Sequence, residues 1–347
     1  MVIPNASQEH LFRGSPLYWE RARNTNLGSS ELDFLSINLR PICNYRCSNC
    51  LSGMGNPQDI TGTLSTEETQ SLVSQARDLG VLAIEISGEG EPLVDRRRLE
   101  EIVSYNNQLG IVTTLFSNGS LLNREILEFL ANNNVSLAIS MDYFNREDYE
   151  QDTCRDGSFD NLIGNINLAR EIYSQYIEEE NGYQIRRLAI HSIANARNLE
   201  QIPLIAEFCG DDIFYSVAPI ANVGNAAEHP ELTQINQQRI QQVTDQYSDG
   251  NLILSDSARQ EHGQDLCGTF IYGIGIRHDG EVLFDAHAFT TSGIIGNVRD
   301  VELRELIRRQ RDFRDLFYEQ FDSGGFCPLR DPNYQRFVES IRGGSNE

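Results

Sequence analysis

Short apolar segments alternate with segments of helical periodicity through residues 34–217. The apolar runs predict six strands, at 34–39, 81–87, 111–116, 135–140, 187–193 and 213–217. Helical patterns lie between them, at 65–80, 96–109, 123–131, 159–173 and 199–209. Strict alternation implies a parallel sheet with helices outside it, joined by right-handed crossovers. Because six units are too few for an eight-stranded barrel, the pattern predicts an α/β fold with an open, partial (βα)6 barrel.

The carboxyl ends of the strands are where the chemistry of such barrels lies. Four polar segments follow four of the predicted strands, at 43–50, 88–92, 117–119 and 140–142. We therefore expect these four segments to meet in space, although they are far apart in the sequence.

The first of these segments has the sequence CNYRCSNC, in which Cys43, Cys47 and Cys50 are three of the seven cysteines of the chain. Three thiolates at this spacing can reach three corners of one metal cluster. An iron–sulfur cube takes four ligands, so this triad leaves one iron without a protein ligand. An open metal position can bind a cofactor or a substrate.

A zinc site, a disulfide framework and plain structural burial fit the cysteine triad less well. A zinc site usually has a fourth Cys or His nearby, and the nearest histidine in the sequence is His10. A disulfide framework is typical of small secreted chains, whereas this chain has 347 residues and no signal-peptide pattern at its start. Buried structural cysteines rarely occur as a spaced triad in a loop. We therefore favour the open cluster.

Composition excludes some partners. The formal net charge of −23 argues against binding to nucleic acid or anionic membranes. No run of about 18 apolar residues predicts a membrane span, and we expect a cytoplasmic protein. All 28 basic residues are arginine. An acidic chain without lysine suits a salt-rich cell interior, so we expect a halophilic archaeal source, with lineage-specific composition as the alternative.

The pattern of elements changes after residue 218. A loop and a predicted polar helix over about 232–247 are followed by a predicted hairpin, 270–276 with 281–284, and by helices near 301–318 and 332–342. We expect an N-terminal extension over 1–32, the partial barrel over 33–220 and a smaller α+β domain over 221–347.

The cysteine spacing, placed directly after the first strand of a (βα)6 chain, resembles the signature of the radical SAM superfamily. This resemblance implies a [4Fe-4S] cluster on the triad and S-adenosylmethionine on its fourth iron. It also implies reductive cleavage of that cofactor to a 5′-deoxyadenosyl radical, which abstracts hydrogen from a substrate. An electron donor such as ferredoxin or flavodoxin would supply the electron.

Further segments resemble the family's cofactor-binding motifs in the right order. The resemblance implies that Glu91 accepts a hydrogen bond from the methionine ammonium, that Asp142 contacts the ribose and that Arg155 pairs with the cofactor carboxylate. The residues that it assigns to the cofactor are Gly90, Glu91, Pro92, Ser117, Asn118, Ser140, Asp142 and Arg155. Asn49 departs from the family, which often has an aromatic residue before the third cysteine.

The C-terminal region resembles a degenerate SPASM/twitch extension, which in relatives holds an auxiliary iron–sulfur cluster. Cys267, Asp285 and Cys327 occupy three of its ligand positions, with His287 or the substrate as a fourth ligand. We favour an extension without metal, because only two of about four expected thiolates are present. Cys154 is a candidate hydrogen-atom donor, with an incidental thiol as the alternative.

The substrate stays open at this point. Relatives with such extensions modify peptides, or dehydrogenate or epimerise sugars and cyclitols, and we expect one of these reactions, although we see no room for a separate leader-binding domain. A viperin-like nucleotide dehydratase is an alternative, based on the motifs around Ser117 and Asp142. A non-catalytic iron–sulfur carrier or redox sensor is a second alternative, although such a protein would not need Glu91, Asp142 and Arg155.

Overall fold

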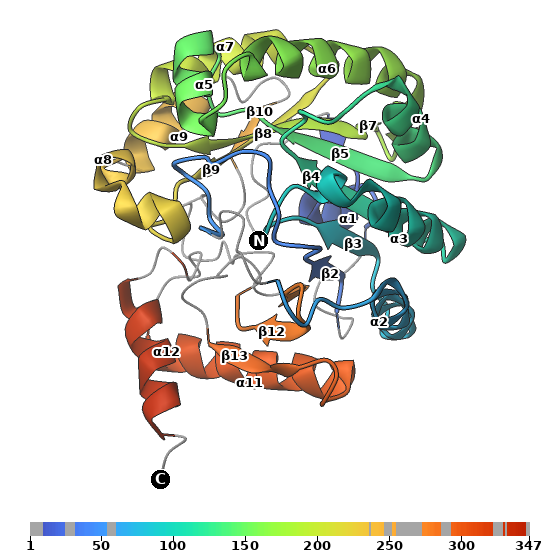
Figure 1. Ribbon diagram of the computed structural model, residues 1–347, viewed down its shortest axis with the longest axis vertical. Coiled ribbons are helices and arrows are strands. Elements are labelled where there is room, and N and C mark those ends of the chain that lie inside the picture. Colours follow the sequence, from blue (N-terminus) through green and yellow to red (C-terminus); the bar gives the residue numbers. More distant parts are fainter. Residues whose placement is uncertain are drawn as a thin grey trace.

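A ten-stranded sheet forms the centre of the computed structural model, which describes residues 10–24, 32–53, 60–235, 237–245, 252–254, 273–285, 293–321, 329 and 332–344. The strand order is β10-β9-β8-β5-β4-β3-β2-β11-β12-β13, and every pair from β10 to β11 is parallel. Helices cover the outer face of this sheet (Figure 1). The predicted α/β fold with a parallel sheet is confirmed.

All six predicted strands are present. They are β2 (Phe34–Ile37), β3 (Ala83–Ile86), β4 (Val112–Ser117), β5 (Val135–Ser140), β8 (Leu188–Ala194) and β9 (Phe214–Pro219). Two further parallel strands lie at the edges of this set, β10 (Leu252–Leu254) beside β9 and β11 (Gly273–Ile276) beside β2. The extension thus continues the sheet of the barrel.

Helices lie between successive strands of the sheet, and two of them begin at the capping residues that the sequence indicates. The helices are α2 (Thr66–Asp78), α3 (Arg96–Gln108), α4 (Arg124–Asn132), α6 (Ser158–Tyr173), α7 (Ile202–Cys209) and α9 (Gln237–Asp245). Ser65 and Glu68 form a full capping box at α2, and Asn123 caps α4. An additional helix, α5 (Arg146–Thr153), ends at Cys154, which adopts a left-handed conformation with φ 53°.

The N-terminal segment closes the amino-terminal end of the barrel. Its strand β1 (His10–Phe12) pairs with β7 (Tyr183–Arg186), and α1 (Pro16–Arg21) follows. Side chains from these elements pack against Phe34, Val112 and other inward-facing residues at the amino ends of the barrel strands. The acidic segment 178–186 forms a hairpin of β6 (Glu178–Glu180) and β7, and β7 also pairs with β1.

The C-terminal extension is α+β. The predicted hairpin is present as β11 and β12 (Glu281–Leu283), followed by β13 (Ile294–Asn297), α11 (Leu303–Gln320) and α12 (Pro332–Gly344). An aromatic cluster that includes Phe284, Phe313 and Phe317 packs between these elements. The predicted polar helix at 232–247 is divided into α8 (Pro230–Thr233) and α9.

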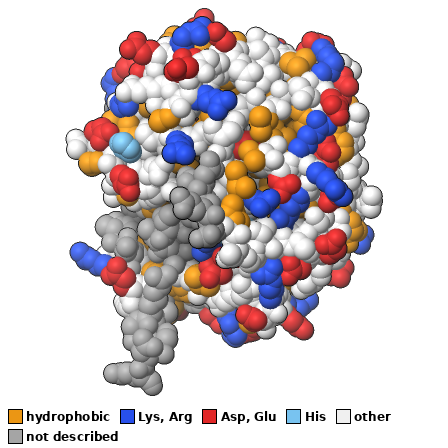
Figure 2. Space-filling view, in the orientation of Figure 1, with side chains coloured by type: hydrophobic (Ala, Val, Ile, Leu, Met, Phe, Trp, Pro, Cys, Tyr) orange, Lys and Arg blue, Asp and Glu red, His pale blue; other side chains and the backbone are white. Residues whose placement is uncertain are grey.

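The described surface carries many paired charges. Acidic and basic side chains lie beside one another around much of the face shown in Figure 2, and most described ion pairs join an arginine to a carboxylate. Among the described helices, none is long and apolar enough to cross a membrane.

Leu11 is fully buried in the N-terminal cluster, which predicts a large stabilising role. Leu11→Ala should lower the free energy of unfolding by about 2–5 kcal/mol. Leu121→Ala is the matched control, since 41% of Leu121 is exposed and its loss should change stability by about 0.5 kcal/mol or less. Denaturant unfolding followed by the fluorescence of Trp19, the single tryptophan, measures both. Equal effects of the two substitutions would contradict this packing.

Candidate cofactor site

The cysteine loop follows β2 and contains all three cysteines of the triad as free thiols. Cys43, Cys47 and Cys50 are partly buried. The residues from Asn38 to Gly53 form no helix or strand, so other segments must satisfy their backbone groups.

Segments distant in sequence hold this loop by its backbone. Asn225 donates from its backbone nitrogen to the carbonyl of Cys50 and from its side-chain nitrogen to that of Cys47, both at 2.9 Å. Asn225 lies in the turn η4 (Gly224–Glu228), where the positive φ of Gly224 (59°) and its closeness to Leu51 leave no space for a side chain. The backbone nitrogen of Arg46 donates to the carbonyl of Thr153, 3.2 Å away.

Two carboxylates bond to the side chains between Cys47 and Cys50. Ser48 donates to Asp152 of α5, and Asn49 donates to Asp142 across 2.6 Å. Asp142 also accepts from the backbone nitrogen of Ile193 at 2.6 Å. Burial, and secondarily the nearby Asp152 carboxylate, raises the pKa of Asp142 to about 7. Asn49, which the sequence singled out only as a departure from the family, therefore joins the cysteine loop to the end of β5.

Glu91 is buried at the start of the turn η1 (Pro92–Asp95) and joins three segments. Its carboxylate accepts from Ser117 Oγ at 2.8 Å, from the backbone nitrogen of Asn118 at 2.7 Å and from that of Leu93 at 3.1 Å. The backbone nitrogen of Glu91 donates to the carbonyl of Ile42 at 2.8 Å. Burial raises the pKa of Glu91, although these hydrogen bonds act in the opposite direction.

Asn118 connects the end of β4 to the loop. Its side-chain nitrogen lies 2.9 Å from Asn44 Oδ1 and 3.9 Å from Cys43 Sγ. The backbone nitrogen of Tyr45 also points to Cys43 Sγ, at 3.4 Å. Donors aimed at a cluster sulfur ligand are a common means of tuning its reduction potential.

The donor set of the loop fits an iron–sulfur cluster. Within the described residues, no three His, Cys, Asp or Glu side chains surround one point closely enough for a single metal ion. A cube does not require such convergence, because each thiolate binds a different iron. Burial raises the pKa of the Cys43 thiol, and burial together with the Asp152 carboxylate raises the pKa of Cys47. Both thiols would therefore be protonated without metal, and coordination would deprotonate them.

The remaining predicted residues lie in different surroundings. Ser140 is partly buried at the end of β5, and Pro92 lines a small surface cavity with Arg40, Ile42 and Glu91. Arg155 and Cys154 are exposed in the turn after α5, next to Asp152 and Thr153, which contact the loop. Asp285 is buried after β12. Cys267, His287 and Cys327 lie outside the described residues.

Several residues that hold the loop escaped the sequence interpretation. Asp152 and Asn225 each contact the loop from more than 100 positions away, and neither belongs to a motif. The sequence pattern places Glu89 in a tight loop, yet its side chain is fully buried. A charged residue between two glycines next to a predicted strand end was the available signal.

Comparison with known proteins agrees with this geometry. Residues 37–176 match the family model described as the Radical SAM superfamily. This part of the chain is therefore similar to the radical SAM superfamily, whose members are enzymes, and the match supports a [4Fe-4S] cluster and S-adenosylmethionine as its cofactors.

Curated relatives differ in what they make. The AdoMet-dependent heme synthase of Methanosarcina barkeri is 27% identical over 201 residues, 57% of this chain and 53% of that protein. A GTP 3',8-cyclase of Clostridium perfringens is 27% identical over 186 residues, 50% of this chain and 57% of that protein. The match thus spans little more than half the length of these relatives.

Solved structures share the fold over more of the chain. Streptococcus suis SuiB bound to S-adenosylmethionine superposes with a TM-score of 0.63 at 18% identity, covering 84% of this chain and 68% of SuiB. The structure of anSMEcpe with bound AdoMet superposes with a TM-score of 0.58 at 14% identity, covering 87% of each chain. At these identities the likeness shows the fold.

Gly90 packs directly on the cysteine loop. A Cβ at this position would lie 2.5 Å from the carbonyl oxygen of Ile42 and 2.6 Å from that of Arg40. Gly90→Ala should therefore displace the loop and destabilise the protein by about 1–3 kcal/mol. The control is Gly164→Ala in α6, which meets no atom within 4 Å and should stabilise by up to about 1 kcal/mol. Thermal unfolding of both variants checks this, and an unchanged melting temperature for Gly90→Ala would contradict it.

Proposed function

We propose that Cys43, Cys47 and Cys50 hold the cluster and that S-adenosylmethionine occupies its open iron. When bound, the pair would supply radical chemistry, started by one-electron reduction of the cofactor and directed at a C–H bond of a substrate. An electron donor such as ferredoxin or flavodoxin would reduce the cluster. The observation that carries this proposal is the convergence of Glu91, Asn118 and Asp142 on the cysteine loop, each through a described hydrogen bond.

Glu91 fits a contact with the cofactor ammonium. A carboxylate has about four lone-pair sites, and three described donors occupy Glu91. One site is left for a charged donor, which would also offset the cost of a buried carboxylate. Asp142 would contact the ribose beside Asn49. The amide of Asn49 would thus stand near the adenosine in place of an aromatic side chain. Arg155 would pair with the cofactor carboxylate from the turn after α5.

A peptide is the substrate class that we favour. SuiB, whose fold matches 84% of this chain, has been solved with a precursor peptide, SuiA, and anSMEcpe with the peptides Cp18Cys and Kp18Cys. The curated relatives that act on GTP favour a nucleotide as the second candidate, but their matches cover only about half of this chain. A sugar or cyclitol is the third candidate.

Each cysteine of the triad should be needed for the cluster. Cys43→Ala, Cys47→Ala and Cys50→Ala should each abolish dithionite-dependent formation of 5′-deoxyadenosine by the anaerobically reconstituted protein. Cys154→Ala is the control, because Cys154 is exposed and outside the triad; it should retain cleavage. Its product distribution tests whether Cys154 donates a hydrogen atom. If the triple alanine variant still cleaved S-adenosylmethionine, the proposal would be wrong.

Iron counting separates one cluster from two. We propose that the extension holds no auxiliary cluster, since the resemblance to a SPASM/twitch extension places Asp285 at the position of an expected cysteine ligand. The reconstituted wild type should then contain about four irons per chain, and the triple alanine variant close to none. About four irons remaining in that variant would instead assign a cluster to Cys267, Asp285 and Cys327.

The substrate can be tested by coupling. A true substrate should accelerate 5′-deoxyadenosine formation above the rate without substrate, and deuterium at the reacting carbon should appear in that product. We expect acceleration by a precursor peptide encoded beside the gene and none by GTP. The opposite result would favour a nucleotide substrate. If no 5′-deoxyadenosine formed under any condition, an iron–sulfur carrier would be favoured instead.

A further inference from the structure

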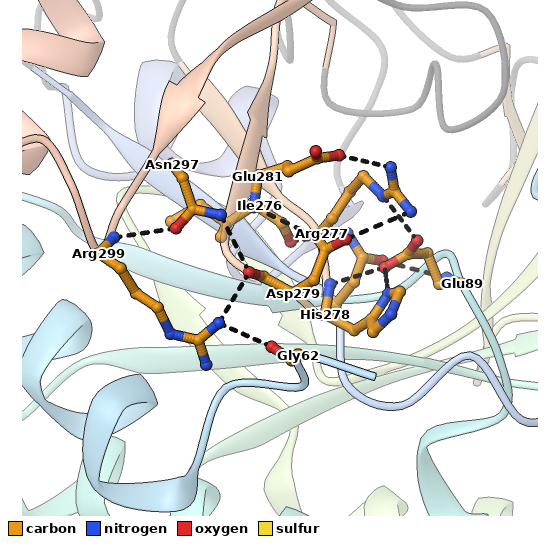
Figure 3. Close-up of polar contacts among 10 residues, drawn as sticks. Gly62, Glu89, Ile276, Arg277, His278, Asp279, Glu281, Asn297 and Arg299 are labelled. Atoms are coloured by element: carbon orange, nitrogen blue, oxygen red, sulfur yellow. Dashed lines mark hydrogen bonds and ion pairs between the residues drawn. The ribbon is translucent and has the colours of Figure 1, made fainter. Parts of the chain in front are cut away.

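Glu89 is a buried carboxylate that none of the expected cofactor contacts uses. Its side chain has no exposed surface, and its partners come from the turn after β11 in the C-terminal extension. Arg277 Nε lies 3.1 Å from one oxygen, while the backbone nitrogen and Nδ1 of His278 lie 2.7 and 3.0 Å from the other (Figure 3). The contacts of Glu89 with Arg277 and His278 thus join the extension to the loop after β3.

The same junction includes the end of β2. Asn38 accepts from the backbone nitrogen of Glu89 at 3.1 Å and donates from its side chain to the carbonyl of Ile276 at 3.0 Å. The backbone nitrogen of Asn38 donates to that same carbonyl at 2.9 Å. Three strand ends, those of β2, β3 and β11, are therefore fixed together at the edge where the cysteine loop begins.

Glu89 is connected to the cysteine loop through the two residues that follow it in the chain. Gly90 packs against the carbonyls of Arg40 and Ile42, and Glu91 donates to the latter. Ile42 directly precedes Cys43. A shift of Glu89 must therefore either break these contacts with the backbone of Arg40 and Ile42 or displace Cys43.

Burial makes this junction sensitive to the loss of one partner. A buried charge is costly unless it is paired and hydrogen-bonded, and removing one member of a buried pair leaves the other uncompensated. Arg277 is further fixed by Glu281, whose carboxylate lies 2.6 Å from its Nη1. The turn 277–281 is consequently held in one position relative to Glu89.

We propose that Glu89, Arg277 and His278 form a positioning junction through which the C-terminal extension holds the cysteine loop in the shape that binds the cluster. Glu89 is a positioning residue, because it acts through Gly90 and Glu91 on Ile42 and Cys43. The extension is thereby a structural part of the cluster site. The proposal rests on the assignment of the cluster to the triad, but its first test does not require the cluster.

A second contact between barrel and extension supplies a matched control. Arg299 binds Glu68 at the start of α2, with Nε 2.6 Å from Oε1 and Nη2 3.0 Å from Oε2. Its Nη1 also donates to the carbonyl of Gly62 at 2.8 Å (Figure 3). This contact joins the same two parts of the chain without touching the cysteine loop.

Hydrogen exchange of the metal-free full chain is the first test. Glu89→Gln removes the charge at constant size and should speed amide exchange in both 40–50 and 277–282. Arg299→Gln should speed exchange only near 60–68 and 297–300. If Glu89→Gln loosened 277–282 but left 40–50 at the wild-type rate, the junction would not position the loop and the proposal would be overturned.

Two substitutions of His278 test the proposal even if the Glu89 variant does not fold. His278→Ala removes a side-chain donor to Glu89, whereas the amide of His278→Asn can replace it. We expect the alanine variant to bind iron about 10-fold to 100-fold more weakly and the asparagine variant to recover most of this affinity. Equal iron affinity and equal exchange in both variants would contradict the proposal. Should the triad prove not to hold the cluster, the exchange result would still decide whether the junction positions the loop.

Discussion

The cysteine loop has no secondary structure of its own, and its shape depends on hydrogen bonds from other segments. Its backbone groups at Ile42, Arg46, Cys47 and Cys50 bond to Glu91, Thr153 and Asn225. Because buried backbone groups must be satisfied, the loop can hold this shape only where the loop after β3, the C-terminal end of α5 and the turn η4 meet. The parallel sheet brings the first two to one edge, and the chain leaving β9 supplies the third.

Buried or partly buried carboxylates recur at this edge in a strongly acidic chain. Glu89, Glu91, Asp142 and Asp152 each accept at least one described hydrogen bond, and Glu89 also pairs with an arginine. A buried negative charge is costly unless it is both hydrogen-bonded and paired with a positive charge. A cationic cofactor group beside Glu91 would lower that cost. The carboxylates at this edge are thus consistent with the proposed cationic ligand.

The sequence was sufficient for the parts that depend on local pattern. Periodicity located the six strands and the crossover helices, and capping chemistry located the starts of α2 and α4. The order of the four polar segments predicted their meeting, because parallel strands share one carboxyl edge. Pairing between distant strands could not be predicted from the sequence. Neither the three-residue strand β10 nor the parallel pairing of β11 with β2 leaves a periodic signal in the chain. Asn49 and Glu89 were missed because their partners, Asp142 and the pair Arg277–His278, are known only once the chain is folded.

The central claim is that an iron of the cluster on Cys43, Cys47 and Cys50 is open to S-adenosylmethionine. Electron paramagnetic resonance of the reduced, reconstituted protein tests it most directly. On our account, adding S-adenosylmethionine changes the g-values of the cluster, because the amino and carboxylate groups of the cofactor become ligands of that iron. An unchanged spectrum at saturating cofactor, in protein that contains a full cluster, would contradict the account.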